Sequence, residues 1–211
     1  KFMKYVLDIS CLDEYSSGAK QRFLNFYTEL VSREKKKQFL IIYTTKNNIK
    51  NFTKFKNVFL KKNPITQENY FKKLISIIYL TIITKISLNR IRAIEYFTLP
   101  FVRLRKSKNI ITIHDLRKIF FSEFFLNKFF LKFFYKYFLK KTDKIIVVSH
   151  AVKNEIFKYF GKMNVSVIYN TIDENFFSKI KNKKIDQIKK KYKLKKNFIL
   201  TVGHQEKRKN F

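Results

Sequence analysis

The sequence predicts an α/β protein built on a doubly wound parallel sheet, followed by the first strand of a second domain. Short apolar runs rich in β-branched and aromatic residues recur along the 211 residues. Most of them are followed by a longer stretch in which apolar residues have helical spacing. The runs are apolar at successive positions, which is typical of parallel strands that are covered on both faces.

The strands and helices of the first domain are expected to alternate. The apolar runs that predict strands are 5–9, 39–43, 57–60, 110–113, 144–148 and 165–168. The segments that predict helices are 18–33, 67–90, 122–141 and 151–159. Each helix has a residue at its start that can cap it, namely Ser17, Thr66, Ser122 and Ser149.

The pattern changes after the last of these strands, which predicts a domain boundary. We expect a Rossmann-like domain at 1–172, a linker and a helix at 173–196, and the start of a second domain at 197–211. A helix is predicted at 185–192 and a new strand at 198–202. Because one strand cannot bury its own apolar faces, we expect the last segment to be structurally incomplete by itself.

The composition is strongly basic. Lysine and arginine number 47 against 15 acidic residues, a net charge of +32, which favours anionic partners. An alternative cause is an A/T-rich genome, since lysine, asparagine, isoleucine, phenylalanine and tyrosine have A/T-rich codons. One cysteine, no long uninterrupted apolar stretch and no signal peptide together predict a cytoplasmic protein.

Candidate site residues follow several predicted strands, at the edge where doubly wound sheets bind ligands. Gly18 starts the first helix and would let a phosphate or sugar approach the backbone closely, or it is a glycine in an ordinary loop. His114 follows the strand at 110–113 and could bind a sugar hydroxyl or transfer a proton; a structural role is the alternative. Asp115 could orient His114 or hold an acceptor hydroxyl.

Further candidates carry weaker signals. Ser149 is first of all a helix cap and Asn170 a turn former. Arg208 and Lys209 follow the predicted strand at 198–202 and could neutralise a diphosphate.

Taken in order, these segments resemble the GT-B glycosyltransferases of family 4, in which two Rossmann-like domains face each other across a cleft. The motifs that carry the resemblance are Thr112-Ile113-His114-Asp115-Leu116, Ile146-Val147-Val148-Ser149, Val167-Ile168-Tyr169-Asn170-Thr171-Ile172-Asp173, and Ile199-Leu200-Thr201-Val202-Gly203 with Arg208-Lys209-Asn210. The segment Glu95-Tyr96-Phe97-Thr98-Leu99-Pro100 is also similar to the one that precedes the His-Asp strand in that family.

The resemblance implies a hexosyltransferase that moves a sugar from a nucleotide diphosphate donor to an acceptor hydroxyl, in glycan or cell-envelope polysaccharide synthesis. It further implies retention of the anomeric configuration and no bound metal. His114 would lie beside the sugars, Gly18 would line the diphosphate and acceptor region, and Lys209 would offset the charge of the leaving diphosphate. Asp115, Ser149 and Asn170 are further candidates for binding substrate.

Two departures from the family pattern affect the donor site. The residue after Gly203 is usually arginine in such enzymes and is His204 here, although Arg208 could supply the charge. The family's pair of donor-site glutamates would lie beyond residue 211, so we expect this chain alone to be inactive.

The helix predicted near residues 120–141 mixes phenylalanines with lysines. It could lie on an anionic membrane, which would place the protein peripherally on the inner face of the plasma membrane. The favoured alternative is a core helix whose lysines face solvent and some of whose phenylalanines are buried. A nucleic-acid or polyanion binding protein is the main rival function, but the lysines are spread along the chain and no recognition motif accompanies them. A truncated, inactive remnant is a further alternative.

Overall fold

The computed structural model divides into two compact units, Lys1–Ile172 and Asp173–Phe211. The residues it describes are 4–10, 12, 18–65, 75, 79, 91–97, 107–116, 125–172, 174–179, 182–195 and 198–199. No helix among these residues is long and apolar enough to span a bilayer.

The first unit is built on a seven-stranded sheet in which all neighbouring strands are parallel. The strand order is β3-β2-β1-β4-β5-β6-β7, so the chain moves outward from β1 in one direction and then returns to build the other half. The doubly wound parallel sheet expected from the sequence is therefore confirmed. The strands are β1 (Lys4–Asp8), β2 (Gln38–Tyr43), β3 (Val58–Lys62), β4 (Ile91–Tyr96), β5 (Lys108–Ile113), β6 (Lys144–Val147) and β7 (Val165–Val167).

The central strands bury side chains on both faces, which explains their uninterrupted apolar sequences. In β1, Leu7 packs into a cluster with Ile41, whereas Val6 packs on the opposite face with Ile42. Successive side chains of a strand point to opposite faces, so a strand covered on both sides needs apolar residues throughout.

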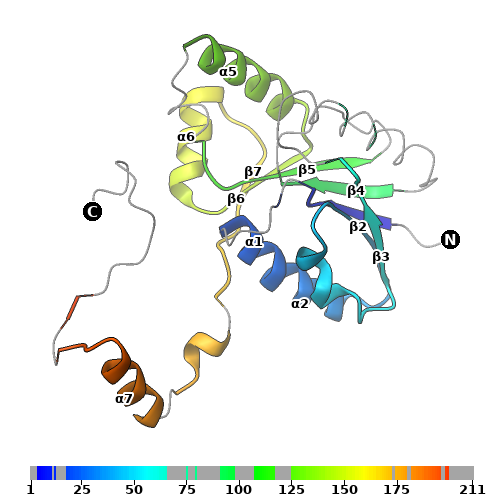
Figure 1. The fold of residues 1–211 in the computed structure, drawn as a ribbon. Coiled ribbons are helices and arrows are strands. Elements are labelled where there is room, and N and C mark those ends of the chain that lie inside the picture. Colours follow the sequence, from blue (N-terminus) through cyan, green and yellow to red (C-terminus); the bar gives the residue numbers. More distant parts are fainter. Residues whose placement is uncertain are drawn as a thin grey trace. The chain divides into compact units, whose positions relative to one another are not determined.

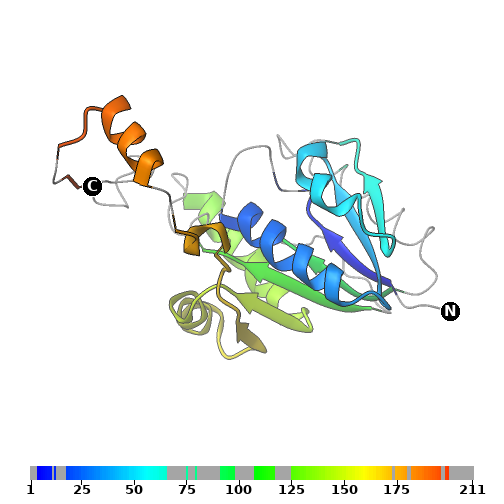
Figure 2. The ribbon, with the colours of Figure 1, turned by 90° about the horizontal axis from the view of Figure 1, so that it is seen from below.

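A continuous helix covers one face of β1 and β2. It comprises α1 (Gly18–Arg22), a π-helical turn η1 (Phe23–Tyr27) and α2 (Thr28–Arg33), within the bounds predicted for the first helix. Its side chains Phe23, Tyr27 and Val31 join Leu7 and Ile41 in one core cluster, which the short 3₁₀ helix η2 (Lys46–Phe52) also enters. Figure 2 shows residues 18–33 crossing in front of the strands.

Two further helices, α5 (Phe125–Lys140) and α6 (His150–Phe160), lie on the other side of the sheet (Figure 1). Leu139 of α5 and Ile156 of α6 pack with Ile111 and Ile145 of the sheet. The predicted helices at 122–141 and 151–159 are thus confirmed over the described residues. The predicted helix at 67–90 lies almost wholly outside the described residues, as do the capping roles expected for Ser17, Thr66 and Ser122.

Strand β4 was not predicted as a strand. Its sequence IRAIEY contains two charged residues, which interrupt the apolar pattern that identifies buried strands. Arg92 is exposed, but Glu95 is buried and accepts a hydrogen bond from the Thr112 hydroxyl of β5. A buried carboxyl group with a partner is compatible with a central strand, although composition alone argues against it.

The second unit contains a short 3₁₀ helix, η3 (Glu174–Phe177), and the helix α7 (Asn182–Lys191). Helix α7 includes most of the helix predicted at 185–192. Residues 198 and 199 have no regular structure, and the rest of the strand predicted at 198–202 lies outside the described residues. Among the described residues, exposed apolar side chains are frequent in this unit, including Phe176, Phe177 and Ile199.

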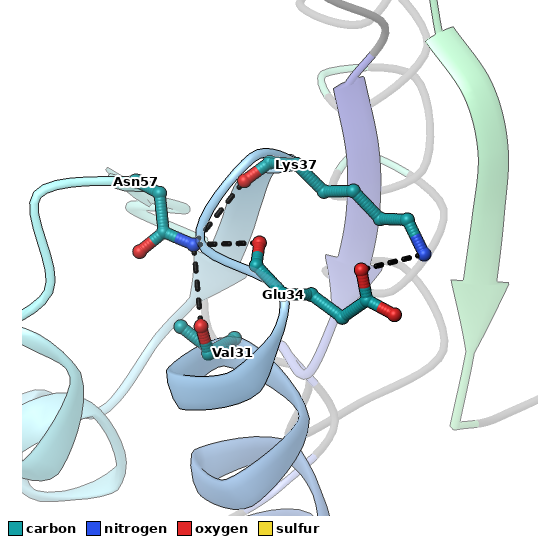
Figure 3. Close-up of polar contacts among 4 residues, drawn as sticks. All are labelled: Val31, Glu34, Lys37 and Asn57. Carbon is teal, nitrogen blue, oxygen red and sulfur yellow. Dashed lines mark hydrogen bonds and ion pairs between the residues drawn. The ribbon is translucent and has the colours of Figure 1, made fainter.

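The end of the helix at residues 18–33 is capped by a distant side chain (Figure 3). The Asn57 amide nitrogen lies 3.2, 3.3 and 3.2 Å from the carbonyl oxygens of Val31, Glu34 and Lys37. These carbonyls belong to the last turn of α2 and to the turn that leads into β2. Asn57 therefore joins three segments just before β3 begins.

We expect Asn57→Ala to lower the free energy of unfolding by about 1–3 kcal/mol, because three part-buried carbonyl groups lose the contact with the Asn57 amide. The Glu34 carbonyl keeps a second donor, the Lys37 N–H. Urea denaturation of the purified chain measures this loss. The matched control is Asn47→Ala, at an exposed position, which should change the free energy by less than about 0.5 kcal/mol. Equal losses in the two variants would show that the Asn57 contacts contribute nothing.

Candidate active site

The candidate residues Gly18 and Asn170 lie next to each other. Gly18 is the first residue of α1, and Asn170 follows β7. A Cβ atom placed on Gly18 would lie 3.9 Å from the Asn170 amide nitrogen, which is ordinary van der Waals contact. Both residues are exposed. The parallel topology brings them together, because the carboxyl end of β7 and the start of the helix that follows β1 lie at the same edge of the sheet.

Arg22 connects these two segments. It is fully buried, and its Nη1 donates hydrogen bonds to the carbonyl oxygens of Ile168, at 2.9 Å, and Tyr169, at 3.0 Å. Its guanidinium also lies 5.4 Å from the ring centroid of Phe26. The first turn of the helix is thus tied to the exit of β7.

The π-helical turn η1 follows Arg22 directly. Its i→i+5 pattern widens the helix, so that Arg22 and Tyr27, five residues apart, are both buried against the sheet. Single π-helical turns within α-helices occur frequently at functional sites. The helix period predicted from the sequence does not distinguish this turn from ordinary α-helix.

Beneath this helix lies a group of buried polar side chains from β4 and β5. Leu7 pairs with Glu95 across the β1–β4 ladder, so Glu95 points to the face covered by residues 18–33. The Thr112 hydroxyl donates to the Glu95 carboxylate at 2.5 Å. Burial raises the pKa of Glu95, while hydrogen bonds from Thr112 and Tyr27 and the charge of Arg22 act in the opposite direction.

The pKa of Tyr27 is shifted by the same surroundings. Burial, followed by the charge of Glu95, raises the pKa of Tyr27 well above its usual value. The phenol therefore stays protonated and serves as a donor to the carboxylate.

His114 follows β5 directly and is positioned by the alternation of that strand. Thr112 and His114 are two residues apart, so they point to the same side of the sheet. Burial, and next the positive charge of Arg22, lower the pKa of His114 to about 4, while Asp115 acts in the opposite direction. The imidazole is therefore neutral at pH 7.

The Nε2 atom of His114 is buried and has no hydrogen-bond partner within the described part of the chain. Buried polar atoms without partners are uncommon in folded proteins and call for an explanation. A neutral imidazole can donate from one ring nitrogen and accept at the other. A substrate hydroxyl that reached Nε2 would supply the missing bond.

The other candidates have different positions. Asp115 is exposed and acts on the charge state of His114. The Ser149 hydroxyl accepts a hydrogen bond from the Val152 backbone N–H at 3.3 Å, so Ser149 caps α6 as expected. Arg208 and Lys209 lie outside the described residues. The binding roles of all these residues, and of Gly18 and Asn170, stay predictions.

Two members of the site were not identified as such from the sequence, Arg22 and Glu95. The available signals were an arginine on the sheet-facing side of a helix that begins with Gly18, and a carboxylate inside an apolar run. An arginine is not conspicuous in a chain with 47 basic residues, and a single carboxylate within an apolar run does not identify a site.

The low pKa of His114 predicts a pH-dependent contribution to stability. Between about pH 6.5 and about pH 4, the unfolded chain binds a proton at His114 and the folded chain does not. The free energy of unfolding should therefore fall as the pH drops through this range, by at most about 1.4 kcal/mol per pH unit from this residue. Urea denaturation of wild type and His114→Gln across the range should give a smaller loss on acidification for the variant.

The control for the substitution itself is His150→Gln, which makes the same change at an exposed histidine. Subtracting each variant from wild type removes the contributions of buried carboxyl groups such as Glu95. Identical pH dependence in wild type and His114→Gln would contradict the depressed pKa.

Comparison with known proteins agrees with this architecture. A sequence profile of glycosyltransferase family 4 matches residues 84–176, a range that includes β4, β5, His114, α5, α6 and β7. The O-antigen chain mannosyltransferase RfbU of Salmonella typhimurium is 29% identical to the chain over 133 residues, or 62% of its length. The chain spans 33% of that relative's length. These matches and the all-parallel sheet agree with the resemblance found in the sequence: over residues 84–176 the chain is similar to glycosyltransferases of family 4.

Proposed function

We propose that the protein transfers a hexosyl group from a nucleotide diphosphate sugar to a hydroxyl of a glycan or cell-envelope polysaccharide, with retention of the anomeric configuration. The observation that carries the proposal is the neutral His114, whose buried Nε2 lacks a partner within the described residues. It lies at the carboxyl edge of the sheet, within the range that matches the model of glycosyltransferase family 4. Similarity to a mannosyltransferase of O-antigen chains supports a hexose donor and a polysaccharide acceptor.

In this reaction the bond between the anomeric carbon and the leaving diphosphate breaks, and a bond to the acceptor oxygen forms. The acceptor proton passes to a phosphate oxygen of the leaving group or to solvent. Positive charge develops on the sugar ring in such transition states. A protonated imidazole beside the ring would oppose that charge. The neutral His114 can instead hydrogen-bond a sugar hydroxyl and hold the ring in place.

The leaving diphosphate needs positive partners. The N-terminus of the helix at residues 18–33 carries the positive end of the helix dipole. Gly18 has no side chain to block the approach of a phosphate to the backbone there. We expect Arg208 and Lys209 to add cationic charge, so that the diphosphate departs without a bound metal.

We expect His114→Ala to lower the transfer rate constant kcat by about 100-fold or more, in the range that positioned polar groups contribute to catalysis. The measurement uses the protein at its full natural length. A panel of nucleotide diphosphate sugars identifies the donor, and release of nucleoside diphosphate in the presence of acceptor gives the rate. Thermal unfolding should show that the variant is folded.

His150→Ala is the control, since it removes an exposed histidine from the start of α6. It should keep the wild-type rate. A wild-type rate in His114→Ala would remove His114 from the mechanism. Absence of transfer with every donor by the unaltered protein would contradict the proposed reaction.

We further infer that α5 binds the surface of an anionic membrane. Several of its aromatic side chains are exposed, although the helix also packs on the core as the alternative expected. Phe129 is 64% exposed, Phe133 60% and Tyr137 47%, and these residues are four apart, so they form one stripe along the helix. On the side of α5 that faces the core, Tyr135 and Leu139 pack against α6 and the sheet.

The charges of α5 suit such a surface. Lys132, Lys136 and Lys140 form a second exposed stripe, which adjoins the aromatic one. The Lys141 ammonium lies 3.9 Å from the ring centroid of Tyr137. Aromatic side chains that enter the lipid interface beside lysines that reach lipid phosphates are typical of helices that lie on anionic membranes.

We expect replacement of Lys132 and Lys136 by glutamine to weaken binding to phosphatidylglycerol-containing vesicles about 30-fold, since each lysine near such a surface contributes about 1 kcal/mol. Phe129→Ser with Phe133→Ser should weaken it as well, through loss of apolar burial. Vesicle co-sedimentation measures both effects. Vesicles of phosphatidylcholine alone should bind weakly.

The matched control replaces the exposed Lys35 and Lys36 by glutamine, which changes the net charge equally at a different place. Phe59→Ser, on the edge strand β3, is the control for loss of an exposed aromatic residue. Equal weakening by the two lysine pairs would show that net charge, and not α5, determines the binding.

A further inference from the structure

Arg22 is an unusual residue in this fold because its side chain is charged and fully buried. Its side chain is 0% exposed, and among the described residues no carboxylate lies within 4.0 Å of it. Only Nη1 has hydrogen-bond partners; Nε and Nη2 have none among the described residues. Burying an ionised group in this way is costly, so the core pays a stability cost at this position.

The two hydrogen bonds of Arg22 join the segments that carry the candidate substrate-binding residues. Arg22 lies one helical turn after Gly18, and its acceptors, Ile168 and Tyr169, directly precede Asn170. In the same region, a Cβ atom placed on Gly18 would lie 3.9 Å from the Asn170 amide nitrogen. The π-helical turn that begins at Phe23 then lets Tyr27 reach Glu95 below.

We propose that Arg22 is a positioning residue for the sugar transfer, which fixes the helix start at Gly18 against the Asn170 segment and sets a permanent positive charge close to His114. The inference rests on the proposed function, because the residues it positions are those proposed to bind the substrates. Arginine suits the role better than lysine. Its planar guanidinium donates to two carbonyl groups from one nitrogen and stays charged at every physiological pH.

The effect on His114 supports the proposal independently of the hydrogen bonds. Three influences act on the imidazole: burial and Arg22 lower its pKa, and Asp115 raises it. Removing the charge of Arg22 would therefore move the pKa of His114 upward.

The test compares Arg22→Met, Arg22→Lys and the control Arg33→Met, in the protein at its full natural length. Arg33 belongs to the same continuous helix, but its side chain is 79% exposed. We expect Arg22→Met to lower kcat/KM about 10- to 100-fold, the order of loss that small misplacements of substrate cause. In the same variant, the NMR titration midpoint of His114 should rise from about 4 towards 6.5. Arg22→Lys should recover part of the activity and keep the midpoint low, and Arg33→Met should match wild type.

Three results would overturn the proposal: wild-type kcat/KM in folded Arg22→Met, a loss of activity with an unchanged His114 titration, or a raised His114 midpoint with wild-type activity. If Arg22→Met does not fold, Arg22→Lys decides, since wild-type kcat/KM in that variant would assign Arg22 to the fold alone. Absence of transfer by the unaltered protein would refute the proposed function instead. The titration needs no substrate, so it would still report whether Arg22 acts on His114.

Discussion

The reversal of strand order beside β1 is the constraint on which the rest of the first unit depends. Strands β2 and β3 extend the sheet on one side of β1, and β4 to β7 extend it on the other. Because all neighbouring strands are parallel, the carboxyl ends of the strands lie at one edge of the sheet. The connections that build one half of the sheet diverge, next to β1, from those that build the other half. Gly18, His114 and Asn170 come from three different connections, yet this topology directs all three to that edge.

The polar residues under the helix carry a cost that an apolar core would avoid. Glu95, Thr112 and Tyr27 satisfy one another, and the raised pKa of Glu95 shows that its ionised form is disfavoured by burial. Arg22 lies close enough to act electrostatically on Glu95, Tyr27 and His114. Replacing a group of buried charged and polar residues by well-packed apolar residues often leaves the free energy of unfolding unchanged or raises it. The presence of this group beside His114, whose Nε2 has no hydrogen-bond partner among the described residues, is therefore easier to explain by chemistry than by stability.

The sequence predicted secondary structure best where the apolar pattern that indicates burial and the local pattern of a helix or strand point to the same element. Strands such as β2, with the apolar sequence QFLIIY, and the helix at residues 18–33 were predicted nearly to their observed bounds. The family resemblance and the position of His114 also followed from sequence. Strand β4 was missed because Glu95 is stabilised by Thr112, a residue of a different strand. Local pattern cannot reveal such a partner.

The site was less predictable than the fold for the same reason. Arg22 acquires its importance from two carbonyl groups more than 140 residues away, Ile168 and Tyr169. The aromatic stripe of α5 could not be located from the sequence, because a helix rich in phenylalanine on several sides does not show which side faces the core. The Leu139 and Tyr135 contacts determine that side, and they depend on the placement of α6.

The position of α5 relates the proposed membrane surface to the proposed transfer site. Helix α5 connects β5 to β6, which are parallel, so it must run from the carboxyl edge of the sheet back to the amino edge. Its first turns, with the exposed Phe129, are therefore nearest to the edge that bears His114. A membrane bound along α5 would approach the site from that end. An acceptor anchored in the membrane could then present its hydroxyl at the edge of the sheet without leaving the bilayer, whereas a nucleotide sugar would enter from solvent.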